Sequence, residues 1–161
     1  MVWGIEARAK SMLDKGDAQS AAEILRRAIA RESRANPRRL NLLGVCEAHS
    51  GHLATARELF SSVLSEFPHN ASALTNMGNL AFLEGDQEGA RQYYVRALQQ
   101  NVFLQEPRFN LVRSYQYMGH FEKAMTAYQD YVAVARLNRW SHLALLFLVV
   151  LLGVLALLAR R

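Results

Sequence analysis

The apolar positions along the chain follow the spacing of an α-helix, and the same pattern repeats at a fixed interval. Three stretches read "GHLATARELF", "GDQEGARQYY" and "GHFEKAMTAY", and they begin at Gly51, Gly85 and Gly119. In each, an alanine follows the glycine and an aromatic residue follows the alanine four positions later, which places both on one face of an α-helix. Each stretch therefore predicts a helix that begins after a glycine turn and buries one face.

The interval from Gly51 to Gly85 equals that from Gly85 to Gly119, and the same interval relates Gly44 to Gly78 and Asn76 to Asn110. The chain therefore repeats with a period of 34. Repeats of roughly 20 to 50 residues are typical of solenoids, in which similar units stack and bury their faces against one another. The sequence predicts a row of helical pairs, with a glycine turn inside each pair.

Gly44 and Gly78, the inner glycines, lie inside the first predicted helix of their pairs. Glycine inside a helix costs roughly 1 kcal/mol of stability relative to alanine, so their presence requires a structural explanation. We expect Gly44 and Gly78 to let the second helix of each pair approach closely beside Ala56 and Ala90. The aromatic residues are expected to fill the space between neighbouring pairs.

This combination resembles the tetratricopeptide repeat family over about residues 2–136. The resemblance implies an all-α fold, a right-handed α-solenoid of about four helical hairpins, in a repeat domain over residues 1–136. The hairpins would occupy about residues 2–36, 37–70, 71–104 and 105–136. Val112 stands where the fourth unit would have its inner glycine, and bulky Tyr131 stands where a small residue is usual. We expect Tyr131 to be tolerated because no further hairpin follows it.

The C-terminal part, residues 137–161, has a different character. From Trp140 it reads "WSHLALLFLVVLLGVLALLARR", and Leu143 to Ala159 carry no charge. A helix from Trp140 to Ala159 would be about 30 Å long, the thickness of a bilayer's hydrocarbon core. The sequence therefore predicts a juxtamembrane segment and a single transmembrane helix over about 140–159. The alternative, a buried core helix, is disfavoured because four hairpins cannot surround a helix that is apolar on every face.

The first residues, "MVWGIEARAK", contain no apolar leader segment. We therefore expect a tail-anchored, single-pass protein with its N-terminal domain in the cytoplasm. The chain has sixteen arginines and three lysines, which favours a bacterial cytoplasmic membrane. A mitochondrial outer membrane is the alternative.

Composition narrows the possible functions. The chain is 51% hydrophobic with only three prolines, which suits helices. Its net charge of +5 is spread along the chain, whereas a nucleic-acid-binding face is a cluster of basic residues, so we do not predict nucleic acid as a partner. Cys46 is the only cysteine, cannot form an internal disulfide, and is expected to be a small buried side chain.

No pattern predicts catalysis or a cofactor. His49 and His52 lie three apart, but no cysteine or carboxylate cluster accompanies them, so we predict no metal site. The sequence has no phosphate-binding glycine loop and no nucleophile elbow. The carboxylates are expected on exposed helix faces. We therefore expect a protein that is not an enzyme.

The resemblance implies that the first helices of successive hairpins line a concave groove that binds a protein partner. Asparagine both donates and accepts hydrogen bonds, so it suits a bound extended peptide or helix, although these asparagines would also serve to bond one hairpin to the next. The subgroup that binds acidic chaperone tails uses lysines at positions that other residues fill here, so that ligand is disfavoured. The candidate groove residues are Asn41, Val45, His49, Thr75, Asn76, Asn79, Phe82, Leu83, Asn110, Arg113 and Tyr117.

A second candidate surface is the terminal patch on the last hairpin, at Tyr128, Tyr131, Val132 and Ala135. It lies where a fifth hairpin would stack, so we expect a partner, the bilayer surface or a folded-back linker to cover it.

The leading functional hypothesis is a membrane-anchored adaptor or scaffold that holds a protein partner at a membrane surface. The alternative is an accessory or assembly subunit of a membrane protein complex, whose span packs against other transmembrane helices. A lesser alternative is a tail-anchored receptor of the organelle-fission type, which has a similar layout of repeats before a C-terminal span.

Overall fold

The computed structural model describes the backbone of residues 3–34 and 36–158, and the side-chain surroundings of residues 4–34 and 36–140. Within these ranges the chain forms eight α-helices and no strand. The predicted all-α class is therefore confirmed. The chain divides into two compact units, residues 1–102 and 103–161, and each is described by itself.

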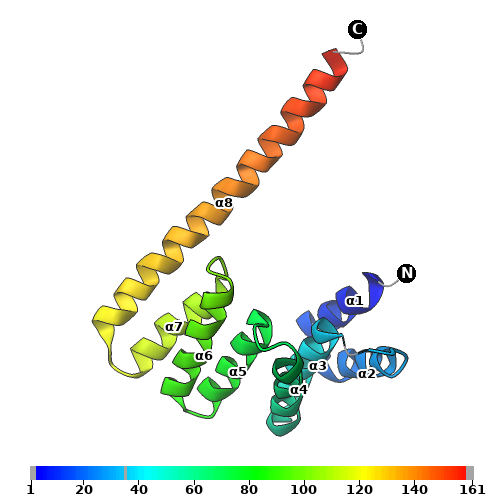
Figure 1. The fold of residues 1–161 in the computed structure, drawn as a ribbon, viewed down its shortest axis with the longest axis vertical. Coiled ribbons are helices and arrows are strands. Elements are labelled where there is room, and N and C mark those ends of the chain that lie inside the picture. The colour runs from blue at the N-terminus through cyan, green and yellow to red at the C-terminus, as the bar shows by residue number, and fades with distance from the viewer. Residues whose placement is uncertain (1–2, 35, 159–161) are drawn as a thin grey trace. The chain divides into compact units, whose positions relative to one another are not determined.

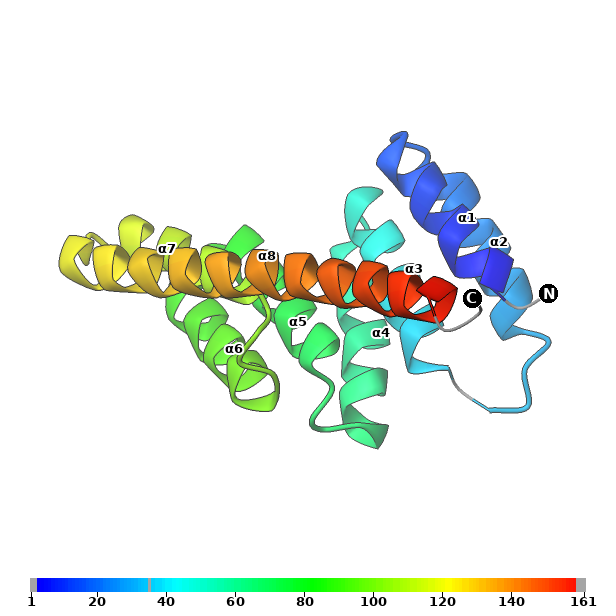
Figure 2. The ribbon, with the colours of Figure 1, turned by 90° about the horizontal axis from the view of Figure 1, so that it is seen from above.

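The first unit holds three helical hairpins in succession (Figures 1 and 2). The two helices of each hairpin pack together, and each hairpin also packs on the next, through α2 on α3 and α4 on α5. The pairs are α1 (Trp3–Asp14) with α2 (Ala18–Ile29), α3 (Pro37–His49) with α4 (Leu53–Glu66), and α5 (Ala71–Leu83) with α6 (Gln87–Gln100).

Glycine turns join the helices of each hairpin, as predicted. Gly51 and Gly85 have φ angles of 83° and 84°, and Gly16 in the first hairpin has 83°. This left-handed region is open to glycine at little cost. The chain can therefore reverse in a tight turn and bring each second helix back along the first.

Side-chain caps start the helices. Asn36 and Asn70, which are one repeat length apart, accept hydrogen bonds from backbone N–H groups at the starts of α3 and α5. Asp17 and Asp86 cap α2 and α6 in the same way. An N-cap satisfies an N–H group that has no partner within the helix, so these residues fix where each helix begins.

The inner glycines make room for aromatic rings. A Cβ atom on Gly44 would lie 2.4 Å from the ring of Phe60, and one on Gly78 would lie 2.5 Å from the ring of Tyr94. We expected these glycines to let the second helix approach closely beside Ala56 and Ala90. Both alanines are buried, and the second-helix atoms nearest to each glycine belong to the aromatic ring of the same hairpin.

Two core clusters join successive hairpins of the first unit, one between the first and second hairpins and one between the second and third. Phe60 and Ala56 of α4 form one cluster with Met77 and Leu80 of α5. The aromatic residue of this repeat therefore fills the space between neighbouring pairs, as predicted, in addition to covering its own glycine.

Two charged side chains are buried in the first unit. Arg39, 4% exposed, donates to Glu6 at 2.7 Å and pairs with Glu32. Glu47, 3% exposed, pairs with Arg26 and lies 2.9 Å from the ring of His52. The expectation that the carboxylates lie on exposed faces is therefore wrong for Glu47. A buried charge is tolerable only with a partner, and Arg26 belongs to another helix.

The second unit contains α7 (Glu106–Tyr117) and α8 (Phe121–Leu158), which pack against each other after a turn at Gly119. α8 is one helix of 38 residues with no break at 136/137 (Figure 1). The structure thus divides the chain at 102/103, whereas the sequence analysis placed its domain boundary at 136/137. No glycine or proline lies between Phe121 and Ser141 to end the helix earlier.

The predicted transmembrane helix begins where the described side-chain surroundings end, at residue 140. In the described part of the chain, no helix is both long enough and apolar enough to cross a bilayer. The predicted span, Trp140 to Ala159, falls almost wholly on residues whose side-chain surroundings lie outside the described ranges. The span therefore stays a prediction.

Candidate functional site

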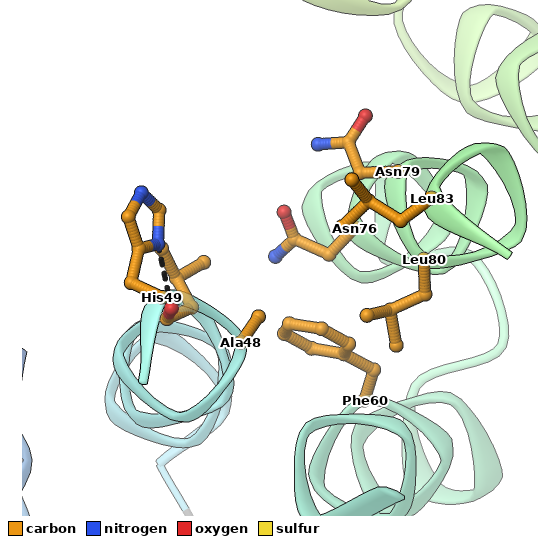
Figure 3. A pocket seen from close by; sticks show the side chains of 8 residues that line it. Ala48, His49, Phe60, Asn76, Asn79, Leu80 and Leu83 are labelled. Carbon is orange, nitrogen blue, oxygen red and sulfur yellow. Dashed lines mark hydrogen bonds between the residues drawn. The ribbon is translucent and has the colours of Figure 1, made fainter. Parts of the chain in front are cut away.

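A pocket of about 220 Å³ lies in the first unit, between α3, α4 and α5 (Figure 3). It has an apolar floor and a polar edge. Its lining residues are Val45, Ala48, His49, Phe60, Asn76, Asn79, Leu80 and Leu83.

Two asparagines of α5 make part of the polar edge. The amide of Asn76 points into the space between α3 and α5 (Figure 3), and it has no hydrogen-bond partner among the described residues. Asn79 is held in place, because the Tyr94 hydroxyl donates a hydrogen bond to its Oδ1 at 2.9 Å. Each amide group carries both donor and acceptor atoms, so the edge matches the two polar groups of a peptide unit.

His49 faces the asparagines from α3 (Figure 3). Its Nδ1 lies 2.9 Å from the carbonyl oxygen of Val45. A carbonyl only accepts, so Nδ1 donates and carries the proton in the neutral ring. Nε2 is then the acceptor atom of the neutral ring.

The floor is apolar and consists of buried side chains. Phe60 and Leu80 are each 1% exposed, whereas Leu83 at the rim is 65% exposed. The ring of Phe60 packs directly on Gly44. The pocket is therefore preformed and can receive an apolar side chain while its amides bond the adjoining backbone.

Five of the predicted groove residues come together in this pocket, namely Val45, His49, Asn76, Asn79 and Leu83. Sequence reasoning missed Ala48, Phe60 and Leu80. Ala48 and Leu80 stand three or four positions from predicted lining residues on the same helices, a spacing that predicts a shared face. Phe60 was taken only as a core residue.

Two predicted groove residues are structural. Asn41 is 7% exposed and donates to Asn70 Oδ1 at 3.2 Å, and Thr75 is 4% exposed and donates to the carbonyl oxygen of Ala71 at 2.9 Å. Asn41 thus bonds one hairpin to the next, which was the alternative left open for the groove asparagines. Phe82 is half-buried and does not belong to the lining of this pocket.

Three further groove predictions lie on α7, in the second unit. Tyr117 is 70% exposed, Arg113 is exposed and Asn110 is half-buried. They belong to a separate compact unit, so they are described apart from the pocket.

The terminal patch lies on α8. Tyr128 is 48% exposed, and Tyr131 is half-buried with its ring centroid 5.6 Å from that of Phe109 on α7. Val132 and Ala135 are half-buried. Sequence reasoning missed Phe121 and Met125, which are 73% and 60% exposed.

No group of three or more metal-ligating side chains occurs in the ranges that the structure describes. Cys46 is fully buried, and this burial raises its pKa to about 11. Since the thiolate is the reactive form, Cys46 acts as a small apolar core residue, as predicted.

Comparison with known proteins identifies the repeat. The family model described as tetratricopeptide repeat matches residues 6–71 and 50–101, which together are more than half of the chain. No curated protein is similar enough to the chain to count as a match.

Solved structures share the fold. A crystal structure of MamA superposes with a TM-score of 0.64 at 21% identity, covering 78% of this chain and 73% of the other. A second MamA structure gives 0.66 at 14% identity, with 84% and 73% covered. A tetratricopeptide repeat protein from Parabacteroides merdae gives 0.64 at 26% identity over 81% of this chain, but this chain spans only 52% of that protein.

Proposed function

The chain belongs to the tetratricopeptide repeat family, and from this premise we propose that it is a non-catalytic adaptor that holds a protein partner at a membrane surface. The pocket of α3, α4 and α5 is the proposed partner site. The C-terminal part of α8 is the proposed anchor.

The main support for the proposed partner site is the position of the Asn76 amide at the edge of an apolar floor. A polar group beside apolar surface gains most when a ligand supplies both a bond to the amide and a side chain for the floor. An extended peptide or a peptide helix offers both. The small volume of about 220 Å³ suits one apolar side chain rather than a cofactor.

Support for the anchor comes from the sequence and from the helix length. α8 runs unbroken to Leu158, and a helix of 38 residues is about 57 Å long. Its C-terminal sequence is uncharged from Leu143 to Ala159. Each strongly apolar residue there favours insertion by roughly 0.3 to 0.6 kcal/mol.

Affinity purification of the full chain from its native membrane tests the partner site. The double variant Asn76→Ala, Leu83→Glu is expected not to recover partners that the unaltered chain recovers. The two substitutions remove the amide and place a charge at the rim of the pocket. Glu58→Gln on an exposed position of α4 is the matched control and should recover the same partners. Equal recovery by both variants would show that the pocket does not bind the partner.

An alkaline wash of membranes tests the anchor separately. The unaltered chain should stay in the membrane pellet. Replacing Leu148 and Leu151 by arginine should release it, because each arginine near the centre of a span costs roughly 2.5 to 3.5 kcal/mol. Release of the unaltered chain would reject the anchor and leave the pocket proposal standing.

A further inference from the structure

The connection between α2 and α3 (Figure 2) forms a basic hollow of about 710 Å³ in the first unit. Its lining includes three exposed arginines, Arg31, Arg34 and Arg38. Six of the chain's sixteen arginines lie within residues 26–39, so positive charge is concentrated around this connection. The other residues that line the basic hollow are Glu32, Ser33, Asn36 and Pro37.

The three arginines of the basic hollow are not neutralised by ion pairs. None of them forms an ion pair with another residue in the part of the chain that the structure describes. Their neighbours Arg26, Arg27 and Arg39 differ, because each of these pairs with a glutamate. The fold therefore uses one set of arginines to bind its own carboxylates and leaves the other set exposed.

Two carboxylates lie close to the basic hollow, and both contact buried Arg39. Glu32 pairs with Arg39, and its Oε2 atom is buried. Glu6 also pairs with Arg39, and Arg38 attracts it from a greater distance. Together with Arg39, the three arginines of the basic hollow make four positive charges against two negative ones. A surplus of two positive charges therefore remains.

The repeat shows that the fold does not need the three arginines. One repeat length later, the connection between α4 and α5 has Ser65, Pro68 and Ser72 at the equivalent positions. The helix cap is the same in both connections, because Asn36 and Asn70 are also one repeat length apart. The arginines are therefore additions to a connection that folds without them, and a ligand explains them better than stability does.

The backbone at the start of α3 is already satisfied. Asn36 Oδ1 accepts hydrogen bonds from the N–H groups of Arg38 and Arg39 at 3.1 and 3.4 Å. Pro37, the first residue of α3, has no N–H group to offer. The N-terminus of α3 adds partial positive charge, but the hydrogen-bond donors of the basic hollow are the guanidinium groups.

We propose that the basic hollow binds a phosphate monoester. A guanidinium group is planar and donates two parallel hydrogen bonds to a phosphate. A phosphate monoester carries about −1.5 to −2 charge at neutral pH and three acceptor oxygens, which matches a surplus of two positive charges and several arginines. A carboxylate brings a single charge and two oxygens, so it would leave part of the surplus uncompensated.

Nucleic acid fits less well, because its binding needs a row of basic side chains along several phosphates. The three arginines instead surround one hollow. Soluble phosphate compounds and lipid headgroups such as phosphatidic acid both supply a phosphate monoester. The lipid source rests on the membrane location proposed above, whereas the soluble source does not.

Equilibrium dialysis of the full chain in a neutral detergent, with labelled inorganic phosphate as the probe, tests the binding. The triple variant Arg31→Ser, Arg34→Gln, Arg38→Ser should bind phosphate about tenfold or more weakly, because it removes the charged donors. Two of its serines are the residues that the next repeat has. The control Arg8→Gln, Lys10→Gln, Lys15→Gln removes three exposed positive charges elsewhere and should bind within about twofold of the unaltered chain.

Native mass spectrometry from the same detergent distinguishes the two sources. For a lipid headgroup, the unaltered chain should bind added phosphatidic acid in preference to phosphatidylcholine, and the triple variant should lose this preference. Phosphate binding without that preference would assign the hollow to a soluble compound. Equal phosphate binding by the triple variant and the unaltered chain would overturn the proposal. So would the absence of bound phosphate, or tighter binding of a short single-stranded RNA than of phosphate.

Discussion

At the scale of single residues, three aromatic side chains stand at equivalent positions but in different surroundings. Phe60 and Tyr94 are each 1% exposed, whereas Tyr128 is 48% exposed. The first two rings lie over a glycine of the same hairpin. Tyr128 has Val112, a buried side chain, at that position. The two buried aromatic residues are thus the two that face a glycine.

The glycine beneath each ring gives the first prediction. Gly78→Ala should destabilise the fold by about 1 to 3 kcal/mol, because its Cβ would lie 2.5 Å from the Tyr94 ring and overpack the core. This exceeds the roughly 1 kcal/mol that alanine gains in helix propensity. The midpoint of urea unfolding, followed by circular dichroism, measures the change.

Gly4→Ala is the control for that prediction, because among the described residues no atom outside its own turn of α1 lies within 4 Å of the added methyl group. It should leave the midpoint unchanged or raise it. In a second control, Tyr94→Leu removes the ring, and Gly78→Ala should then cost less than in the unaltered chain. An equal cost in both backgrounds would refute the role of the ring.

The ion pair between buried Arg39 and Glu6 predicts how the stability of the fold depends on pH. Its hydrogen bond lowers the pKa of Glu6 from the ordinary value of 4.5. A depressed pKa in the folded chain means that ionised Glu6 stabilises the fold above about pH 4.5, and that this contribution is lost as the pH falls through the depressed value. Glu6→Gln should therefore lower stability by about 0.5 to 1 kcal/mol at neutral pH.

The measurement is urea unfolding at several pH values. The curves of Glu6→Gln and the unaltered chain should converge as the pH drops well below 4.5. Glu58→Gln, at an exposed position, should run parallel to the unaltered chain throughout. A constant gap between Glu6→Gln and the unaltered chain would contradict the ionic origin.

At the scale of helices, the starts of α3 and α5 are fixed more firmly than that of α7. Asn36 and Asn70 cap the first two. The N-cap of α7 is Gln105, whose side chain makes no capping bond. One repeat length after Asn70 the chain has Leu104, which cannot accept a hydrogen bond. The unit boundary at 102/103 therefore falls just before the uncapped helix.

Asn70 offers a prediction about caps. Its Oδ1 accepts from the Ala73 N–H at 2.9 Å and from the Asn41 amide at 3.2 Å. Asn70→Ala should cost about 2 kcal/mol or more, because α5 loses its cap and a buried amide loses its acceptor. Asp86→Ala removes only the bond from the Gly89 N–H and should cost about 1 kcal/mol.

The midpoints of urea unfolding of Asn70→Ala and Asp86→Ala test this difference in stability. Asn70→Asp keeps an acceptor for both donors and should recover most of the loss. Equal destabilisation by Asn70→Ala and Asp86→Ala would mean that the bond between hairpins adds nothing.

At the scale of the whole molecule, the two units predict where the chain is first cut. Phe103 is 59% exposed and lies between α6 and α7. Exposed connections between compact units are the preferred sites of proteolysis. Brief treatment with chymotrypsin should therefore cleave first after Phe103 and release the three N-terminal hairpins, as mass spectrometry would show.

Phe67, between α4 and α5, is the internal comparison. It is 37% exposed, but its backbone N–H is bonded to Val63 and both flanking helices pack together within one unit. It should be cut about tenfold more slowly. Cleavage at Phe67 as fast as at Phe103 would contradict the division into two units.

The sequence by itself determined the helical class, the glycine turns and the family, because each rests on local backbone rules that recur in every repeat. It also placed Val45, His49, Asn76, Asn79 and Leu83 on faces that meet in the pocket, since helical spacing fixes which residues share a face.

Only the tertiary structure decided which partners those faces meet. It placed Asn41 and Glu47 inside, because their partners Asn70 and Arg26 come from other parts of the fold. It set Phe60 rather than Ala56 against Gly44. It left Tyr128 exposed, although Phe60 and Tyr94 at the equivalent positions are buried. Packing depends on side chains that other helices supply, and no rule of helical spacing contains them.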